Sequence, residues 1–347
     1  MFIATLVAKD RLSAGDISAA MDRLVAASPL VGEGRGEGRA ASAEQKPTQA
    51  SKTNPDWASD TRVAASFGLQ TRAALHPPVG HPLPPGERGI VVLGTATLAE
   101  HKAIDIHFSG DPVIARAALE EQIPDVDVII QPESDRRRKL IIADMDSTMI
   151  TIECIDELAD YAGIKPQIAA VTERAMRGEL DFEDALRSRV ALLADLSEDV
   201  VQQCLRERVK LMPGARELVA QIHANGGYAV LVSGGFTHFA GPVGEMIGFD
   251  RVIANRLGFT GGKLNGTVEG AIVGAQTKRD TLLAMLAEKG WPVAASMAVG
   301  DGANDIPMIE AAGLGVAYHA KPKTKAAAAA SVSFGDLGVL AFAVGLV

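Results

Sequence analysis

The second half of the chain alternates short apolar segments with helical segments, and this alternation restricts the fold more than any other sequence feature. The apolar segments have strand lengths and lie at residues 140–143, 228–232, 296–299 and 314–317. Strands without a polar face are typical of a parallel sheet that helices cover on both sides. We therefore predict an α/β fold with a doubly wound parallel sheet over residues 139–347. Residues 153–208 lack a strand signal and predict a helical cap inserted after the first strand.

The first part of the chain has another order of elements. Its periodicity predicts strands and helices at residues 2–8, 13–27, 90–93, 103–108, 111–121 and 125–130, with Asp111 as a helix N-cap before Pro112. The order β-α-β-β-α-β is that of a ferredoxin-like α+β domain, as in many ACT domains. We expect an ACT-like domain at residues 1–132. Residues 133–138 should form a basic, solvent-exposed linker that leads into the next strand. A packing or dimerisation module without a ligand is an equal alternative for this domain.

Residues 28–89 interrupt the first domain. They contain the run GEGRGEG, a polar Ala/Ser/Thr/Gln stretch and the run HPLPPG. Such a composition buries too little apolar surface to offset chain entropy. We interpret the segment as a disordered insertion, with a docking segment as the alternative.

Composition excludes several classes of protein. The chain has 34 Lys+Arg against 43 Asp+Glu, a formal charge of −9, which argues against a broad nucleic-acid surface. Cys154 and Cys204 are too few for a disulfide scaffold, and we expect both to be buried. The N-terminus lacks a basic region and is interpreted as a strand, not a signal peptide. Since no apolar run reaches the roughly 18 residues of a membrane span, we expect a cytoplasmic protein.

Acidic residues follow two of the predicted strands. Asp144 and Asp146 come directly after residues 140–143, and Asp301 and Asp305 follow residues 296–299. Parallel strands present their carboxyl ends at one edge, where the four carboxylates would repel one another. Oxygen ligands without His or Cys favour Mg²⁺. The alternatives are an Asp pair that caps a turn and a calcium loop, whose EF-hand spacing is absent.

Two further segments suit a phosphate group. Small residues at 233–235 follow a strand and precede a helix, so their N–H groups can approach an anion. Lys278, at the start of a helix to about residue 289, adds a positive charge. Together with the carboxylates, these residues predict a phosphoryl-transfer site in which Asp144 attacks phosphorus and Asp146 is the general acid and base. Metal ligands would be Asp144, Asp301 and the Asp146 carbonyl, with Asn304 and Asp305 orienting them.

Four motifs appear in the order that the haloacid dehalogenase superfamily shows: DMDST at 144–148, SGG at 233–235, Lys278, and GDGAND at 300–305. The match covers about residues 139–334 and implies a Rossmann-type core. More narrowly, the chain resembles the phosphoserine phosphatase family in three segments, TIECIDELA, RAMRGELDFEDALRSRV and SGGFTHFA.

This resemblance implies a Mg²⁺-dependent conversion of O-phospho-L-serine to L-serine, the last step of phosphorylated serine synthesis. Glu153 would meet the substrate ammonium, and Arg189 would pair with its carboxylate. The implied phosphate and substrate contacts are Ser233, Gly234, Lys278 and Asn304, and the residues around the site are Thr148, Asp305, Met176 and Phe182. Without the resemblance, Glu153 is a first-turn residue favoured by the helix dipole and Arg189 an ordinary helical arginine.

Other functions stay open on the sequence alone. The same chemistry could serve phosphohomoserine or a sugar phosphate, or a phosphotransferase that passes the phosphoryl group to an alcohol. A different class is an amino-acid-binding regulator with a vestigial phosphatase site. A homodimer is also left open. We expect a small-molecule substrate and neither a nucleic-acid nor a membrane partner.

Overall fold

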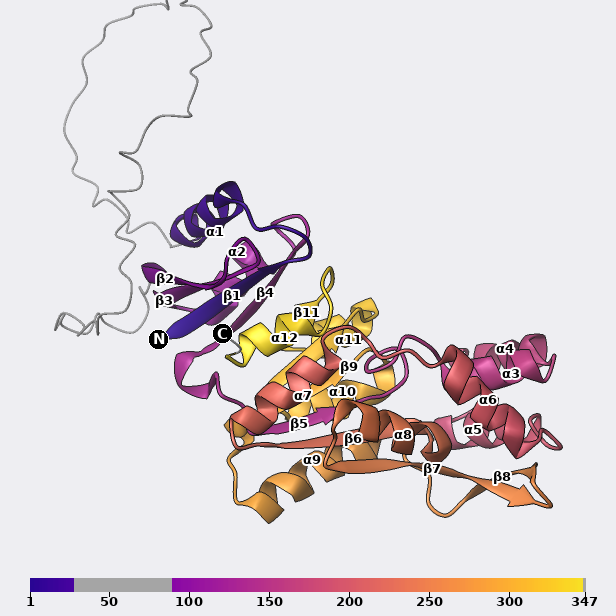
Figure 1. The fold of residues 1–347 in the computed structure, drawn as a ribbon. Coiled ribbons are helices and arrows are strands. Elements are labelled where there is room, and N and C mark those ends of the chain that lie inside the picture. The colour runs from indigo at the N-terminus through magenta and orange to yellow at the C-terminus, as the bar shows by residue number, and fades with distance from the viewer. Residues whose placement is uncertain (28–88, 346–347) are drawn as a thin grey trace, which may run out of the picture. The chain divides into compact units, whose positions relative to one another are not determined.

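The structure is a computed structural model that describes residues 1–27 and 89–345 (Figure 1). The insertion predicted at residues 28–89 lies outside the described residues, apart from Gly89. Within the described ranges, no helix combines the length and the apolar character needed to cross a membrane.

The N-terminal elements follow the predicted order. They are β1 (Phe2–Ala8), α1 (Ala14–Ala26), β2 (Val91–Ala99), β3 (Ala103–Ser109), α2 (Pro112–Leu119) and β4 (Val126–Pro132). All neighbouring strands are antiparallel, in the order β2-β3-β1-β4. This is the ferredoxin-like arrangement. That these residues form a separate ACT-like domain bounded by a linker stays a prediction.

Local sequence signals explain the helix starts. Ser13 caps α1 in a capping box with Asp16, and the Asp111 carboxylate accepts from the Val113 N–H at 2.8 Å ahead of α2. Strand β2 extends six residues beyond the predicted end at Leu93. It is a mostly exposed edge strand with an irregular register around Gly94, so the alternation of burial that marks a strand is missing.

One residue of the predicted linker departs from the expected solvation, whereas Ser134 and Arg137 are exposed. Its Arg138 side chain is only 1% exposed. The guanidinium donates to the Ala294 carbonyl and, at 2.9 Å, to Gln131 Oε1. The expectation failed because it rested on charge alone, whereas acceptors from β4 and from the 3₁₀ turn Val293–Ala295 surround this arginine.

The second sheet confirms the predicted α/β fold. Its strands are β5 (Leu140–Ala143), β6 (Tyr228–Phe236), β7 (Arg251–Thr260), β8 (Lys263–Glu269), β9 (Ser296–Gly300), β10 (Leu314–Tyr318) and β11 (Ala330–Val332). The order is β11-β10-β9-β5-β6-β7-β8, and every neighbouring pair is parallel except β7 with β8.

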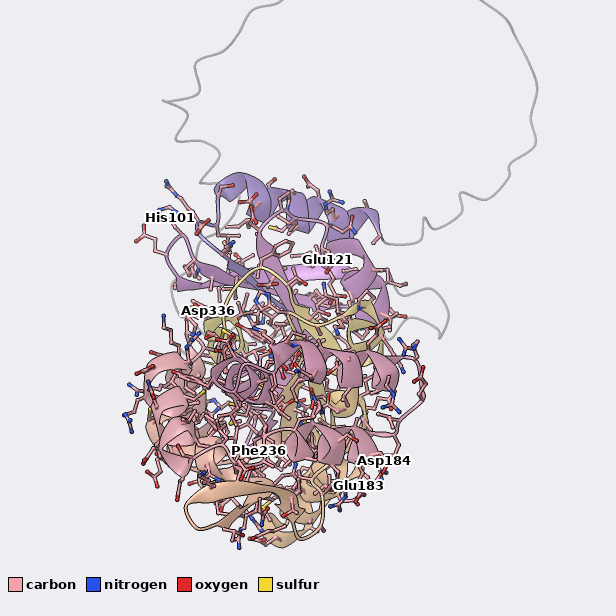
Figure 2. The ribbon with its side chains drawn as sticks, turned by 90° about the vertical axis from the view of Figure 1, so that its right-hand side faces the viewer. His101, Glu121, Glu183, Asp184, Phe236 and Asp336 are labelled. Atoms are coloured by element: carbon pink, nitrogen blue, oxygen red, sulfur yellow. The ribbon has the colours of Figure 1, made fainter. Side chains whose placement is uncertain are left out.

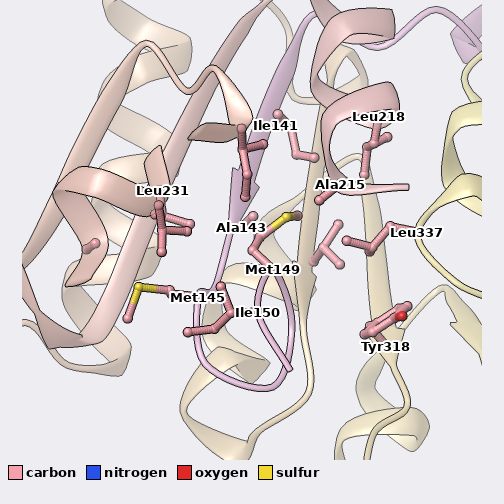
Figure 3. Close-up of a cluster of buried hydrophobic side chains, with 14 of the residues drawn as sticks. Ile141, Ala143, Met145, Met149, Ile150, Ala215, Leu218, Leu231, Tyr318 and Leu337 are labelled. Atoms are coloured by element: carbon pink, nitrogen blue, oxygen red, sulfur yellow. The ribbon is translucent and has the colours of Figure 1, made fainter. Parts of the chain in front are cut away.

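Helices on both faces bury β5. Ile141 and Ala143 pack in one hydrophobic cluster with Ala215 and Leu218 of α7, as Figure 3 shows. The alternate side chains, Leu140 and Ile142, belong to another cluster with residues of α9 and α10. Because successive strand side chains point to opposite faces, β5 must be apolar throughout. The helices of the core are α7 (Ala215–Ala224), α8 (Thr237–Ile247), α9 (Ala275–Lys289), α10 (Ile306–Ala311), α11 (Pro322–Ala327) and α12 (Gly338–Ala343).

The segment predicted as a cap is helical. It forms α3 (Cys154–Tyr161), α4 (Lys165–Met176), α5 (Phe182–Ala191) and α6 (Glu198–Arg208). The β7–β8 hairpin was not predicted, although its Gly261–Gly262 turn, with φ of +60° and +75°, is a recognised hairpin signal. Asp195 N–H donates to the Leu264 carbonyl at 2.8 Å, so this hairpin anchors the loop between α5 and α6.

Candidate active site

The predicted motifs meet at one edge because β5 lies between β6 and β9. Ala143 is in register with Leu231 of β6 and with Val299 of β9. Asp144 follows directly, and Ser233 and Asp301 each come two residues after the strand partner of Ala143. The chain leaves β5 at the point where strand order reverses, which is where open α/β sheets bind ligands.

A pocket of about 210 Å³ opens at this edge and contains most of the predicted site residues. Figure 2 views the molecule from the cap side and labels Phe236, which lines the pocket, and Glu183 and Asp184 in the first turn of α5. The pocket is lined by Asp144, Asp146, Glu153, Ile155, Phe182, Leu186, Arg189, Ser233, Gly234, Gly235, Phe236, Asp301, Gly302 and Asn304. The predicted residues Thr148, Lys278 and Asp305 lie buried behind this wall.

Lys278 forms ion pairs with two carboxylates of the site. Its ammonium lies 2.7 Å from Asp144 Oδ1 and 2.6 Å from Asp305 Oδ1. Helix α9 begins at Ala275, so Lys278 lies one turn inside it and not at its start as predicted. A fully buried ammonium is tolerated because it has two carboxylate partners.

Asp144, Asp301 and Asp305 each offer a carboxylate oxygen, and these oxygens lie within 4.8 Å of one another. Thr148 Oγ1 donates to Asp301 Oδ1 at 3.1 Å. Burial, followed by the charge of Asp144, raises the pKa of both Asp301 and Asp305. Crowded buried carboxylates of this kind are a candidate metal centre.

The residues present fit a hard divalent cation. Every donor is oxygen, and one ammonium cannot neutralise the surrounding carboxylates. Asp146, which also lines the pocket, has a buried Oδ1 without a hydrogen-bond partner. Its pKa is raised, first by burial and then by the charge of Glu153. A carboxyl group in that state is suited to donating a proton.

Two glycines allow the backbone to lie close to polar side chains of the site. A Cβ on Gly235 would lie 3.0 Å from Ser233 Oγ and 3.1 Å from Asp146 Oδ2. A Cβ on Gly300 would lie 2.4 Å from the Asp305 carboxylate. Side chains at these two positions would displace the groups that define the site.

Asn255, which no sequence motif indicated, supports the predicted anion-binding loop. Its Nδ2 donates to the Gly234 carbonyl at 2.8 Å, and its Oδ1 accepts from the Val273 N–H at 2.8 Å. Ser233 Oγ accepts from the Gly235 N–H at 2.8 Å within the same loop. Asn255 lies in β7, outside every motif, so only the pairing of β6 with β7 reveals its role.

Two charged cap residues face the pocket. Glu153 is the N-cap residue of α3, but its side chain does not cap the helix; it accepts from Ser147 Oγ at 2.6 Å. Arg189 Nε donates to the Ala185 carbonyl at 3.3 Å, and burial lowers the pKa of Arg189. Among the described residues, Arg189 has no carboxylate at ion-pair distance. Both charges thus remain available to a ligand.

Phe182 closes the apolar side of the pocket. It is 41% exposed, and a Cβ added to Gly234 would lie 3.2 Å from its Cζ. The ring therefore lies against the predicted anion-binding loop. Met176 ends α4, but its side chain lies outside what the structure describes, so its predicted position by the site cannot be compared.

Comparison with known proteins agrees with this geometry. Residues 141–310 match the model of the haloacid dehalogenase-like hydrolases. A phosphoserine phosphatase of Albidiferax ferrireducens is 47% identical over 57% of this chain and 86% of its own length. The chain belongs to the haloacid dehalogenase-like hydrolase family.

A sequence match and a structural match, both from Vibrio cholerae, agree with this family assignment. A phosphoserine phosphatase of that organism is 51% identical over 57% of this chain and 60% of its own length. The crystal structure of a probable phosphoserine phosphatase from Vibrio cholerae has a TM-score of 0.63 at 40% identity and covers 76% of this chain and 85% of that one. The matches thus span 60% and 64% of the first two curated relatives.

Proposed function

We propose that the protein is a Mg²⁺-dependent phosphomonoester hydrolase that converts O-phospho-L-serine to L-serine and phosphate. One observation carries the proposal: a single pocket presents Asp144, Asp146 with an unpartnered Oδ1, and Arg189 beside a glycine-rich loop. Curated relatives named phosphoserine phosphatase, at 40–51% identity, support the substrate. The reaction would complete the phosphorylated route to serine.

Asp144 is the proposed nucleophile. Its carboxylate attacks phosphorus and forms an aspartyl-phosphate, while Asp146 gives its proton to the departing serine alkoxide. Asp146 then takes a proton from the water that hydrolyses the aspartyl-phosphate. The raised pKa of Asp146 suits the first of these steps.

Positive groups compensate the charge of the phosphoryl oxygens. The N–H groups beside Ser233 and Gly234 are the proposed contacts, with Asn304 at the pocket wall. Lys278 is the further proposed phosphate-binding residue, and from its buried place beside Asp144 it adds a positive charge to the site. Asp144, Asp301 and the Asp146 carbonyl would hold Mg²⁺, which supplies Lewis-acid stabilisation of the phosphoryl oxygens when bound. Thr148 and Asp305 hold Asp301 and Lys278 in place.

The cap supplies the proposed amino-acid specificity. The substrate carries an ammonium and a carboxylate in addition to its phosphate. Glu153 and Arg189 place one charge of each required sign on the pocket wall. A neutral or purely anionic phosphate ester would leave one of these two charges without a partner.

A substrate panel tests the proposal. Phosphoserine should give the highest kcat/KM among phosphoserine, phosphohomoserine, glucose 6-phosphate and p-nitrophenyl phosphate, measured by phosphate release. Added homoserine with product analysis would reveal transfer to an alcohol. A better turnover of any other ester would contradict the assigned substrate, and no turnover of any ester would favour a vestigial site.

Metal removal should abolish activity reversibly. We expect EDTA to reduce phosphate release to background and Mg²⁺ to restore it, because the carboxylates would otherwise repel the phosphate dianion. Ca²⁺, which prefers more ligands at longer distances, should restore much less. Full activity after exhaustive chelation would contradict a metal requirement.

A further inference from the structure

A second pocket, of about 390 Å³, lies away from the candidate active site. Elements that contribute to it include α2, β4 and β10, with the segment that precedes β11. Its wall is mainly apolar, with two arginines and no acidic residue. It is lined by Phe2, Pro112, Val113, Arg116, Ile130, Gln131, Pro132, Arg138, Gly313, Leu314 and Ala329. Volume and lining resemble those of small-molecule sites.

Arg138 introduces a positive charge without a direct ion pair into this wall. Its side chain is 1% exposed, and only neutral oxygens, on Ala294 and Gln131, accept from its terminal nitrogens. Nε has no hydrogen-bond partner, and no carboxylate of the described chain lies at ion-pair distance. Burial lowers the pKa of Arg138 to about 10, yet the group stays charged at neutral pH. The carboxylate of Asp135 acts on Arg138 from beyond ion-pair distance and partly offsets this lowering of the pKa. A buried charge without a paired carboxylate is unfavourable unless a counter-ion joins it.

Arg116, the other arginine of the wall, is already paired. Its Nε lies 2.6 Å from Glu120 Oε2, and its Nη1 donates to the Ala328 carbonyl at 2.6 Å. The arginine of this pocket without an ion pair is therefore Arg138. A guanidinium has five N–H donors in a planar fork, which suits the two oxygens of a carboxylate.

We propose that this pocket binds a small organic carboxylate with an apolar substituent. The carboxylate pairs with Arg138, and the substituent lies against Phe2, Ile130 and Leu314. An inorganic anion would leave the apolar wall without a contact, and a neutral apolar molecule would leave the arginine without a counter-ion.

Thermal shift and calorimetry with 4-methylpentanoate test the site. The full chain should gain a few degrees in Tm at millimolar 4-methylpentanoate. Neither 4-methylpentanamide, of the same shape, nor acetate should do so. Absence of a shift with the acid, or equal shifts with acid and amide, would overturn the proposal.

Matched variants locate the binding. Arg138→Gln should lose the shift, whereas Arg137→Gln, at the exposed neighbouring position, should retain it. Val113→Trp keeps Arg138 and substitutes a residue that is 73% exposed; it should block the pocket without loss of folding. Arg189→Gln should retain the shift, because Arg189 lines the candidate active-site pocket. If both Arg138→Gln and Val113→Trp retained the Tm shift, or if Arg189→Gln lost it, the assignment of binding to this pocket would be overturned.

Discussion

Asp144→Asn should lower kcat for phosphoserine by about 10⁴-fold or more. An amide is a poor nucleophile towards phosphorus, and the change also removes one charge from the candidate metal centre. The aspartyl-phosphate cannot form, so the loss should appear in kcat and extend to p-nitrophenyl phosphate. Steady-state phosphate release with both esters measures the effect.

Loss of structure must be separated from loss of chemistry in this variant. Asp144 pairs with Lys278, so Tm should be measured beside the rates. Asp160→Asn is a suitable control, because Asp160 lies on α3 and makes only a surface ion pair with Arg208. If the Asp144→Asn protein is folded and keeps about a tenth or more of the wild-type kcat, Asp144 is not the nucleophile.

Arg189→Ala should lower kcat/KM for phosphoserine by about 10²–10³-fold, because a charge-assisted contact with the substrate carboxylate is lost. The same variant should change p-nitrophenyl phosphate turnover by less than about threefold, since that ester has no carboxylate. Rates for both esters, measured on one preparation, give the comparison.

Arg187→Ala provides the control on the same helix. Arg187 is an exposed residue that pairs with Glu183 at 2.6 Å and does not line the pocket. It should leave both rates near wild type. Equal losses for the two esters in Arg189→Ala would show that Arg189 supports the cap and does not read the substrate carboxylate.

Much of the candidate active site could be predicted because its motif residues directly follow strands of the parallel sheet. The buried segment at residues 140–143 fixes the direction of Asp144, and parallel strands necessarily end at one edge. The spacing of Asp301 from β9 then brings it towards Asp144, as the structure confirms. Asn255 could not be predicted in this way, because its two hydrogen bonds depend on which strand pairs with β6.

Burial of polar groups was the least predictable property. Arg138 belongs to a basic run that favours solvent, and its surroundings come from β4 and from a turn more than a hundred residues away. The end of the edge strand β2 was unpredictable for a similar reason. Most of its residues are exposed, so its sequence carries no alternation of buried and exposed positions. Burial depends on the packing of distant elements, which local composition does not encode.

The sequence by itself determined the alternation of strands and helices, the acidic residues at strand ends and the helical nature of residues 153–208. These features follow from local periodicity and from the chain direction of parallel strands. Only the tertiary structure decided that Lys278 bridges Asp144 and Asp305, that Asn255 holds the glycine-rich loop, and that Arg138 is buried against the Ala294 and Gln131 oxygens. Each of these contacts joins residues far apart in the chain, and strand order and helix packing set their distances.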